Sequence, residues 1–165
     1  MKNLFFTVRG CISQKVFCLG VVGLFVFVTA MNALLRYLDN NNAAFIIALF
    51  FPFLALYMIY AVYGKRLHDM GRSVWAVTGA VFFEFLTCIG VMLAFGGAEY
   101  FAAFSQYERK AVIEEDVRQA LIVEYQTEMA AQQDVINILL LIIPVALTLW
   151  LIIGKPKTED NPYRM

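Results

Sequence analysis

The side chains best suited to chemistry gather in one short stretch, in which three basic residues surround a histidine and an aspartate. These residues are Lys65, Arg66, His68, Asp69 and Arg72. At the level of lipid headgroups each basic side chain adds about 1 kcal/mol of attraction to anionic lipid, so the stretch predicts an anion or headgroup site. The histidine could sense pH. Its aspartate neighbour is weak support for catalysis, because adjacent residues on a helix point in different directions. An enzyme that acts on headgroups is therefore only a third hypothesis.

The same stretch also has an architectural interpretation, as the turn between two helices. Residues three apart on a helix face each other, so Asp69 is expected to lie between Arg66 and Arg72. Gly71 suits the left-handed position that ends a helix, and Ser73 can cap the helix that follows. We favour this interpretation, with nonspecific contact to anionic lipid, over a dedicated ligand site.

Residues 65–75 read KRLHDMGRSVW. This segment resembles the Arg-Leu-His-Asp-x-Gly-Arg-Ser-Gly-Trp signature of a family of small bacterial inner-membrane proteins, the domain-of-unknown-function family 805, with Val74 in place of the usual glycine. The start and the end of the chain are also similar to this family, at Gly10, Ile12, Ser13, Lys15, Phe17, Asn161 and Tyr163. The resemblance implies a multi-span inner-membrane protein with a retained first helix and no assigned activity. It supplies no catalytic residue.

A second candidate for chemistry is Glu84, which lies in the middle of an apolar stretch. An acidic side chain at a membrane centre costs about 2.5–3.5 kcal/mol on insertion scales and usually finds a partner. Pro52 and Pro144 lie at the middle of two other apolar stretches and leave the carbonyls of Ala48 and Leu140 without their usual donors. We expect a protonated Glu84 to donate to one of these carbonyls or to a hydroxyl at similar depth. The candidate hydroxyls belong to Thr29, Tyr57 and Thr148. Interhelical bonding is the favoured role, and a proton or cation relay in a small transporter or channel subunit is the alternative.

These residues need long apolar helices to position them. Of the 165 residues, 61% are hydrophobic and 16% are charged, whereas a soluble domain carries about 25% charged residues. Four stretches approach the roughly 20 residues that cross a bilayer: 16–35, 43–63, 74–95 and 135–153. Because backbone groups in lipid must bond internally, each is predicted to be a helix. The sequence thus predicts an all-α polytopic membrane protein, a four-transmembrane-helix bundle that forms one membrane domain over residues 1–165.

The basic residues also predict an orientation. Nine of the 13 lysines and arginines lie in the two tails and the second loop, which places both termini in the cytoplasm of a bacterium, with the chain in its inner membrane. A signal peptide cleaved after residues 28–30 is an alternative, although the apolar run is longer than a signal core of about 7–15 residues. The zero net charge favours no nucleic-acid partner. Three dispersed cysteines and one histidine favour no metal or cofactor.

Residues 98–134 form the longest segment outside the predicted spans and carry eight acidic residues against three basic ones. Apolar side chains recur there at every fourth position, which predicts one or two amphipathic extracytoplasmic helices, the last of which continues into the fourth span. The stripe consists of Ile113, Val117, Leu121, Tyr125 and Met129. Packing on the protein's own helices is the preferred role of the stripe, and docking of a protein partner or a second copy is the alternative. Our first functional hypothesis is a non-enzymatic envelope accessory protein that binds its partner through this loop.

Overall fold

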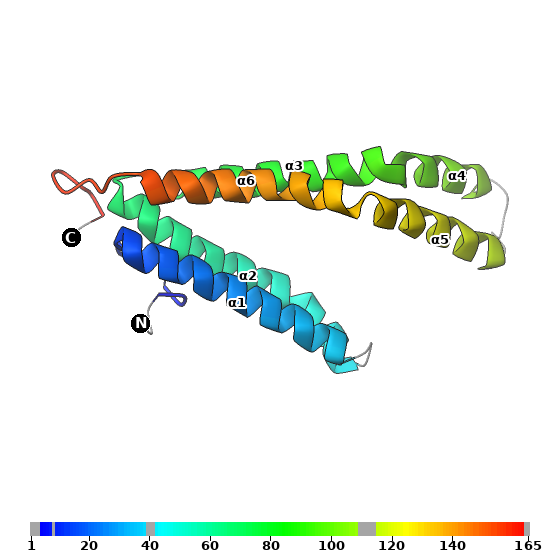
Figure 1. The fold of residues 1–165 in the computed structure, drawn as a ribbon, viewed down its shortest axis with the longest axis horizontal. Helices are drawn as coiled ribbons and strands as arrows, with labels where there is room; N and C mark the ends of the chain where they lie inside the picture. Colours follow the sequence, from blue (N-terminus) through cyan, green and yellow to red (C-terminus); the bar gives the residue numbers. More distant parts are fainter. Residues whose placement is uncertain (1–3, 8, 39–41, 109–114, 164–165) are drawn as a thin grey trace. The chain divides into compact units, whose positions relative to one another are not determined.

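The computed structural model describes residues 4–7, 9–38, 42–108 and 115–163. The described residues are all-helical and contain no strand (Figure 1). The helices are α1 (Gln14–Tyr37), α2 (Asn42–Asp69), α3 (Trp75–Met92), the π-helical turn η1 (Leu93–Gly97), α4 (Ala98–Glu108), α5 (Glu115–Ala131) and α6 (Gln133–Ile153). Four segments in the described residues are long and apolar enough to cross a membrane: Gln14–Tyr37, Ala44–Asp69, Trp75–Ala103 and Gln133–Ile153. The prediction of an all-α chain with four spans is confirmed.

The chain divides into two compact units, one formed by residues 1–79 and 148–165 and the other by residues 80–147. The prediction of one membrane domain concerns both units together and stays a prediction. In each of the four apolar segments no more than 17% of the most hydrophobic window is buried. Large apolar side chains therefore cover the outside of these helices, as lipid contact requires.

In the first unit, α1 packs against α2 through a glycine and an aromatic pair. Gly20 lies so close to Val62 that a Cβ added at the glycine would stand 2.8 Å from a methyl carbon of the valine. Phe17 is fully buried and meets the ring of Tyr63 edge to face, with 5.2 Å between the ring centroids. These contacts involve residues that precede the signal-cleavage site considered above. Cleavage there would remove this packing surface from α2.

The residues before α1 fold back along the same two helices. The Lys65 ammonium donates to the carbonyl of Leu4 at 2.9 Å, and the Tyr57 hydroxyl donates to the carbonyl of Phe6 at 2.9 Å. The ring of Phe5 covers Gly23, where an added Cβ would stand 2.8 Å from the ring. The start of the chain thus becomes part of the packing of α1 and α2.

In the second unit, α3 ends at a sharp kink where the predicted third span ends. Phe95 has φ −107° and ψ 60°, and Gly96 has φ +94°, so both leave helical geometry. The left-handed φ of Gly96 is readily adopted by a residue without a Cβ. This kink separates the apolar helix α3 from α4.

Helix α5 runs almost directly into α6, as expected. The Gln132 amide donates to the carbonyl of Glu128, and the Ile136 amide donates to the carbonyl of Gln132, so helical hydrogen bonding spans the junction.

The amphipathic stripe packs within the second unit. Val117, Leu121, Tyr125 and Met129 are half-buried, whereas most of the residues between them are exposed. They belong to α5, which lies beside α4 and η1 (Figure 1). Ile113, the first residue of the predicted stripe, lies outside the described residues. The preferred role of the stripe, packing on the protein's own helices, is confirmed for the part that the structure describes.

Candidate functional site

The predicted loop ends α2 with a Schellman motif, a pair of hydrogen bonds that closes a helix around a left-handed residue. The Arg72 amide donates to the carbonyl of Leu67 at 2.8 Å, and the Gly71 amide donates to the carbonyl of His68 at 3.0 Å. Gly71 has φ +68°, which confirms the left-handed position predicted from the sequence.

The side chain of Arg66, a residue of α2, caps the carboxy-terminal end of α6. Its Nε donates to the carbonyl of Leu151 at 3.0 Å, and its Nη2 donates to the carbonyl of Gly154 at 2.6 Å. Its Nη1 forms an ion pair with Asp69. The last carbonyls of a helix have no partner within the helix and carry its partial negative charge. The buried guanidinium of Arg66 supplies hydrogen-bond donors to these carbonyls and a positive charge beside the end of α6.

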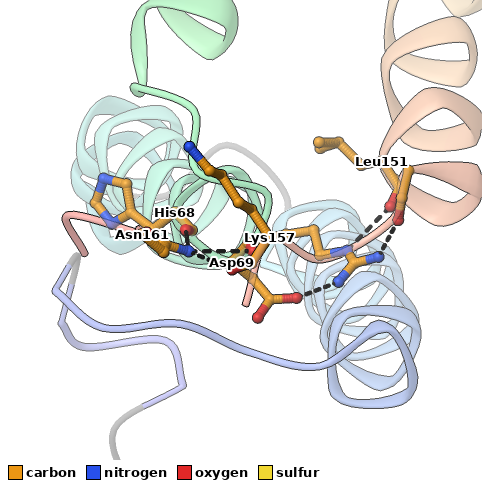
Figure 2. Close-up of polar contacts among 7 residues, drawn as sticks. His68, Asp69, Leu151, Lys157 and Asn161 are labelled. Atoms are coloured by element: carbon orange, nitrogen blue, oxygen red, sulfur yellow. Dashed lines mark hydrogen bonds and ion pairs between the residues drawn. The ribbon is translucent and has the colours of Figure 1, made fainter. Parts of the chain in front are cut away.

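The tail that follows α6 caps α2 in return. The Lys157 amide donates to the carbonyl of Asp69 at 2.9 Å. The Asn161 Nδ2 donates to the carbonyl of His68 at 2.8 Å and to that of Asp69 at 3.3 Å. Figure 2 shows these bonds together with those of the guanidinium to the end of α6. The ends of α2 and α6 therefore cap each other, and we call this arrangement the loop–tail cluster. It comprises Arg66, His68, Asp69, Lys157, Asn161 and the carbonyls at the end of α6.

His68 joins both tails to this cluster. Its ring stacks on that of Tyr163 at 4.0 Å and 11°, and it hydrogen-bonds the backbone of Gly10. The Cys11 thiol donates to the carbonyl of Tyr163 at 3.5 Å. The Nδ1 atom of His68 is buried without a hydrogen-bond partner among the described residues. The three segments that carry the family resemblance thus meet in one place, although they lie far apart in the sequence.

The burial of these residues decides between the two interpretations of the stretch. Lys65, Arg66 and Asp69 are 4%, 1% and 3% exposed, and the two basic side chains are directed to backbone carbonyls. Arg72 is exposed, and its guanidinium carbon lies 5.1 Å from the centre of the Trp150 ring. The geometry favours the architectural interpretation for the three buried residues and leaves Arg72 exposed. The expected pairing of Asp69 with Arg66 is confirmed, whereas Arg72 is placed over Trp150.

Glu84, the second candidate for chemistry, carries a buried oxygen, Oε2, that has no hydrogen-bond partner among the described residues. Two of the three candidate acceptor hydroxyls have hydrogen-bond partners other than Glu84. The Tyr57 hydroxyl donates to Phe6, and the Thr148 hydroxyl lies 2.7 Å from that of Tyr63. The expected hydrogen bond from Glu84 to a neighbouring helix is therefore not formed by this oxygen.

The structure also contains a cleft that the sequence did not predict. It lies between η1, α4 and α5, and three glutamates and two tyrosines line it: Glu99, Tyr100, Glu124, Tyr125 and Glu128. The acidic character of this segment was evident from the sequence. The paired glycines at 96 and 97 were the available signal for the kink that brings α4 beside α5.

Comparison with protein families, curated proteins and solved structures finds no match to this chain. The resemblance to the domain-of-unknown-function family 805 therefore stays a prediction.

Proposed function

We propose that this chain is an integral protein of the bacterial inner membrane with both termini in the cytoplasm. In this proposal it acts as a non-enzymatic envelope accessory protein that binds a partner through the hairpin of α4 and α5. Four apolar helices support membrane insertion, and the excess of lysine and arginine in the tails and second loop supports the orientation.

The observation that carries this proposal is the charge of the α4–α5 hairpin. Its exposed acidic residues are Glu99, Glu115, Asp116, Glu124 and Glu128. Arg118 is the basic residue in the described part of these two helices, and it bonds Glu115 of the same helix. A strongly acidic hairpin favours a partner with a basic surface, because complementary charge steers association.

The loop–tail cluster supports the same proposal by elimination. Its buried charged side chains, Arg66 and Asp69, bond helix-end carbonyls and each other, so they serve to hold the ends of α2 and α6 together. On the cytoplasmic side of this proposal, the exposed basic residues Lys15, Arg72, Lys155 and Lys157 would contact anionic lipid.

Site-specific photo-crosslinking in living cells tests the partner. A photoreactive residue at Val123, which is 58% exposed on α5, is expected to form a discrete adduct. Phe53, which is 68% exposed on α2, is the matched control in the apolar region. Neutralising Glu124 and Glu128 should abolish the Val123 adduct if charge recruits the partner. Equal adducts from both positions, or an adduct that survives neutralisation, would contradict the proposal.

A second candidate is a small transporter or channel subunit that uses Glu84. It is supported by the buried, unpartnered Oε2 atom within a membrane-spanning helix, because intramembrane acids often mark ion or proton pathways. Purified protein in liposomes should then conduct protons or cations, and Glu84→Gln should abolish the flux without unfolding the chain. Normal folding without any flux in the unmodified protein would exclude this candidate.

A further inference from the structure

The cleft of the α4–α5 hairpin has the size of one small chemical group. Its volume is about 150 Å³. An apolar cavity of similar volume in another protein accommodates a benzene molecule. The cleft is thus too small for a drug-sized ligand, for which pockets of about 300–1,000 Å³ are usual.

Two aromatic rings form part of its wall. The centroids of Tyr100 and Tyr125 lie 5.5 Å apart, and their planes are tilted by 36°. Both side chains are half-buried, one from α4 and the other from α5. Faces of aromatic rings attract cations, and paired rings recognise alkylammonium groups in other proteins.

The kink at Gly96 brings a carboxylate to the same cleft. A Cβ at this position would collide with Oε2 of Glu128, so the glycine allows the carboxylate to approach the backbone of η1. Gly96 itself lines the cleft. The left-handed φ of Gly96 forms the kink, and its missing side chain leaves room for the Glu128 carboxylate.

The charge lining the cleft is negative. Glu99, Glu124 and Glu128 contribute three carboxylates, and none of them has an ion-pair partner among the residues that the structure describes. No three acidic, histidine or cysteine side chains in the described ranges come close enough together to hold a metal ion. Separated carboxylates around aromatic rings suit a larger cation whose charge is spread over several atoms.

We propose that this cleft binds one organic cationic group, an alkylammonium or a guanidinium. The inference deepens the proposed function and rests on it, because it names the chemistry by which the hairpin would recognise a partner. The cation is either a free amine or the end of a lysine or arginine side chain.

Calorimetric titration of the full chain in nanodiscs of zwitterionic lipid tests this inference. The probes are choline and putrescine, with 3,3-dimethyl-1-butanol as the neutral analogue of choline. Saturable binding of at least one amine and none of the alcohol is expected. Tyr125→Ala should weaken amine binding roughly tenfold, the change that about 1.4 kcal/mol produces. Tyr125→Phe keeps the ring and should preserve most of the affinity, which separates loss of the ring from loss of the fold.

The matched charge control is on the same helix. Glu128→Gln should weaken amine binding several-fold, whereas Asp116→Asn, which removes the same charge outside the cleft, should leave the affinity within about twofold because exposed distant charges are screened by salt. Equal weakening by the two substitutions, or equal binding of the neutral alcohol, would overturn the inference.

Crosslinking at Val123 in the presence of putrescine distinguishes the sources of the cation. Loss of the adduct indicates that a partner's basic side chain occupies the cleft, and a persistent adduct with bound amine indicates a free amine as the ligand. A persistent adduct without any amine binding contradicts the inference and leaves the proposed function standing. Amine binding without any adduct leaves the inference standing and contradicts the proposed function.

Discussion

The substitution Arg66→Met tests whether reciprocal capping stabilises the ends of α2 and α6. Arg66 is 1% exposed, and its guanidinium bonds the carbonyls of Leu151 and Gly154 and the carboxylate of Asp69. Methionine keeps the unbranched apolar stem but is shorter and has no donor and no charge. The substitution therefore removes the polar contacts and keeps the packing of the aliphatic part of the side chain.

The expected loss in the free energy of unfolding follows from the contacts that the substitution removes. Asp69 is 3% exposed and would lose its ion pair with Arg66. Removing one member of a buried ion pair typically costs about 3–5 kcal/mol. The loss of the hydrogen bonds to the carbonyls of Leu151 and Gly154 is already included in this cost, because one guanidinium makes all three contacts. We expect the free energy of unfolding to fall by about 3–5 kcal/mol, a large part of the roughly 5–15 kcal/mol that stabilises a typical protein.

Reversible unfolding of the protein in mixed micelles measures this change. Arg72→Met is the matched control, because Arg72 is exposed and its contact with Trp150 is worth about 0.5–1 kcal/mol at an exposed site. Adding Asp69→Asn to Arg66→Met should recover part of the loss, because it neutralises the buried carboxylate that Arg66 balanced. The reasoning is refuted if Arg66→Met costs no more than Arg72→Met, or if the double variant is less stable than the sum of the single losses predicts.

Further predictions concern the turn, the tail and the topology. Gly71→Ala should lower the free energy of unfolding by about 1–3 kcal/mol, because φ is +68° at this position. Gly79→Ala in α3 is the control in the same assay. An added Cβ there meets nothing within 4 Å, so the free energy of unfolding should stay unchanged or rise. Asn161→Ala removes the amide that bonds the last carbonyls of α2 and should cost about 1–2 kcal/mol, with faster hydrogen exchange at the end of that helix but not at its middle. A cysteine at Val123 should react with an impermeant thiol reagent from outside the inner membrane, and one at Lys155 only after permeabilisation; labelling in the reverse order would contradict the orientation.

The sequence alone determined the elements of this protein. Four apolar runs of membrane-spanning length predict four helices, because a backbone in lipid has to satisfy its own hydrogen bonds. Gly71 predicts the end of α2, since the left-handed conformation is readily adopted without a Cβ. The fourfold spacing of Val117, Leu121, Tyr125 and Met129 predicts the packed face of α5. Each of these features depends on residues close together in the chain.

The tertiary structure alone decided what the charged residues do. The sequence showed Arg66 as one of several basic residues suited to headgroups, and its burial against carbonyls 85 and 88 residues away could not be inferred from its neighbours. The meeting of Gly10, His68 and Tyr163 likewise depends on where both tails fold. A helix-end carbonyl can accept a hydrogen bond from any donor that lies close to it. Which side chain lies there depends on how the helices pack, and the spacing of residues along the sequence carries no information on that packing.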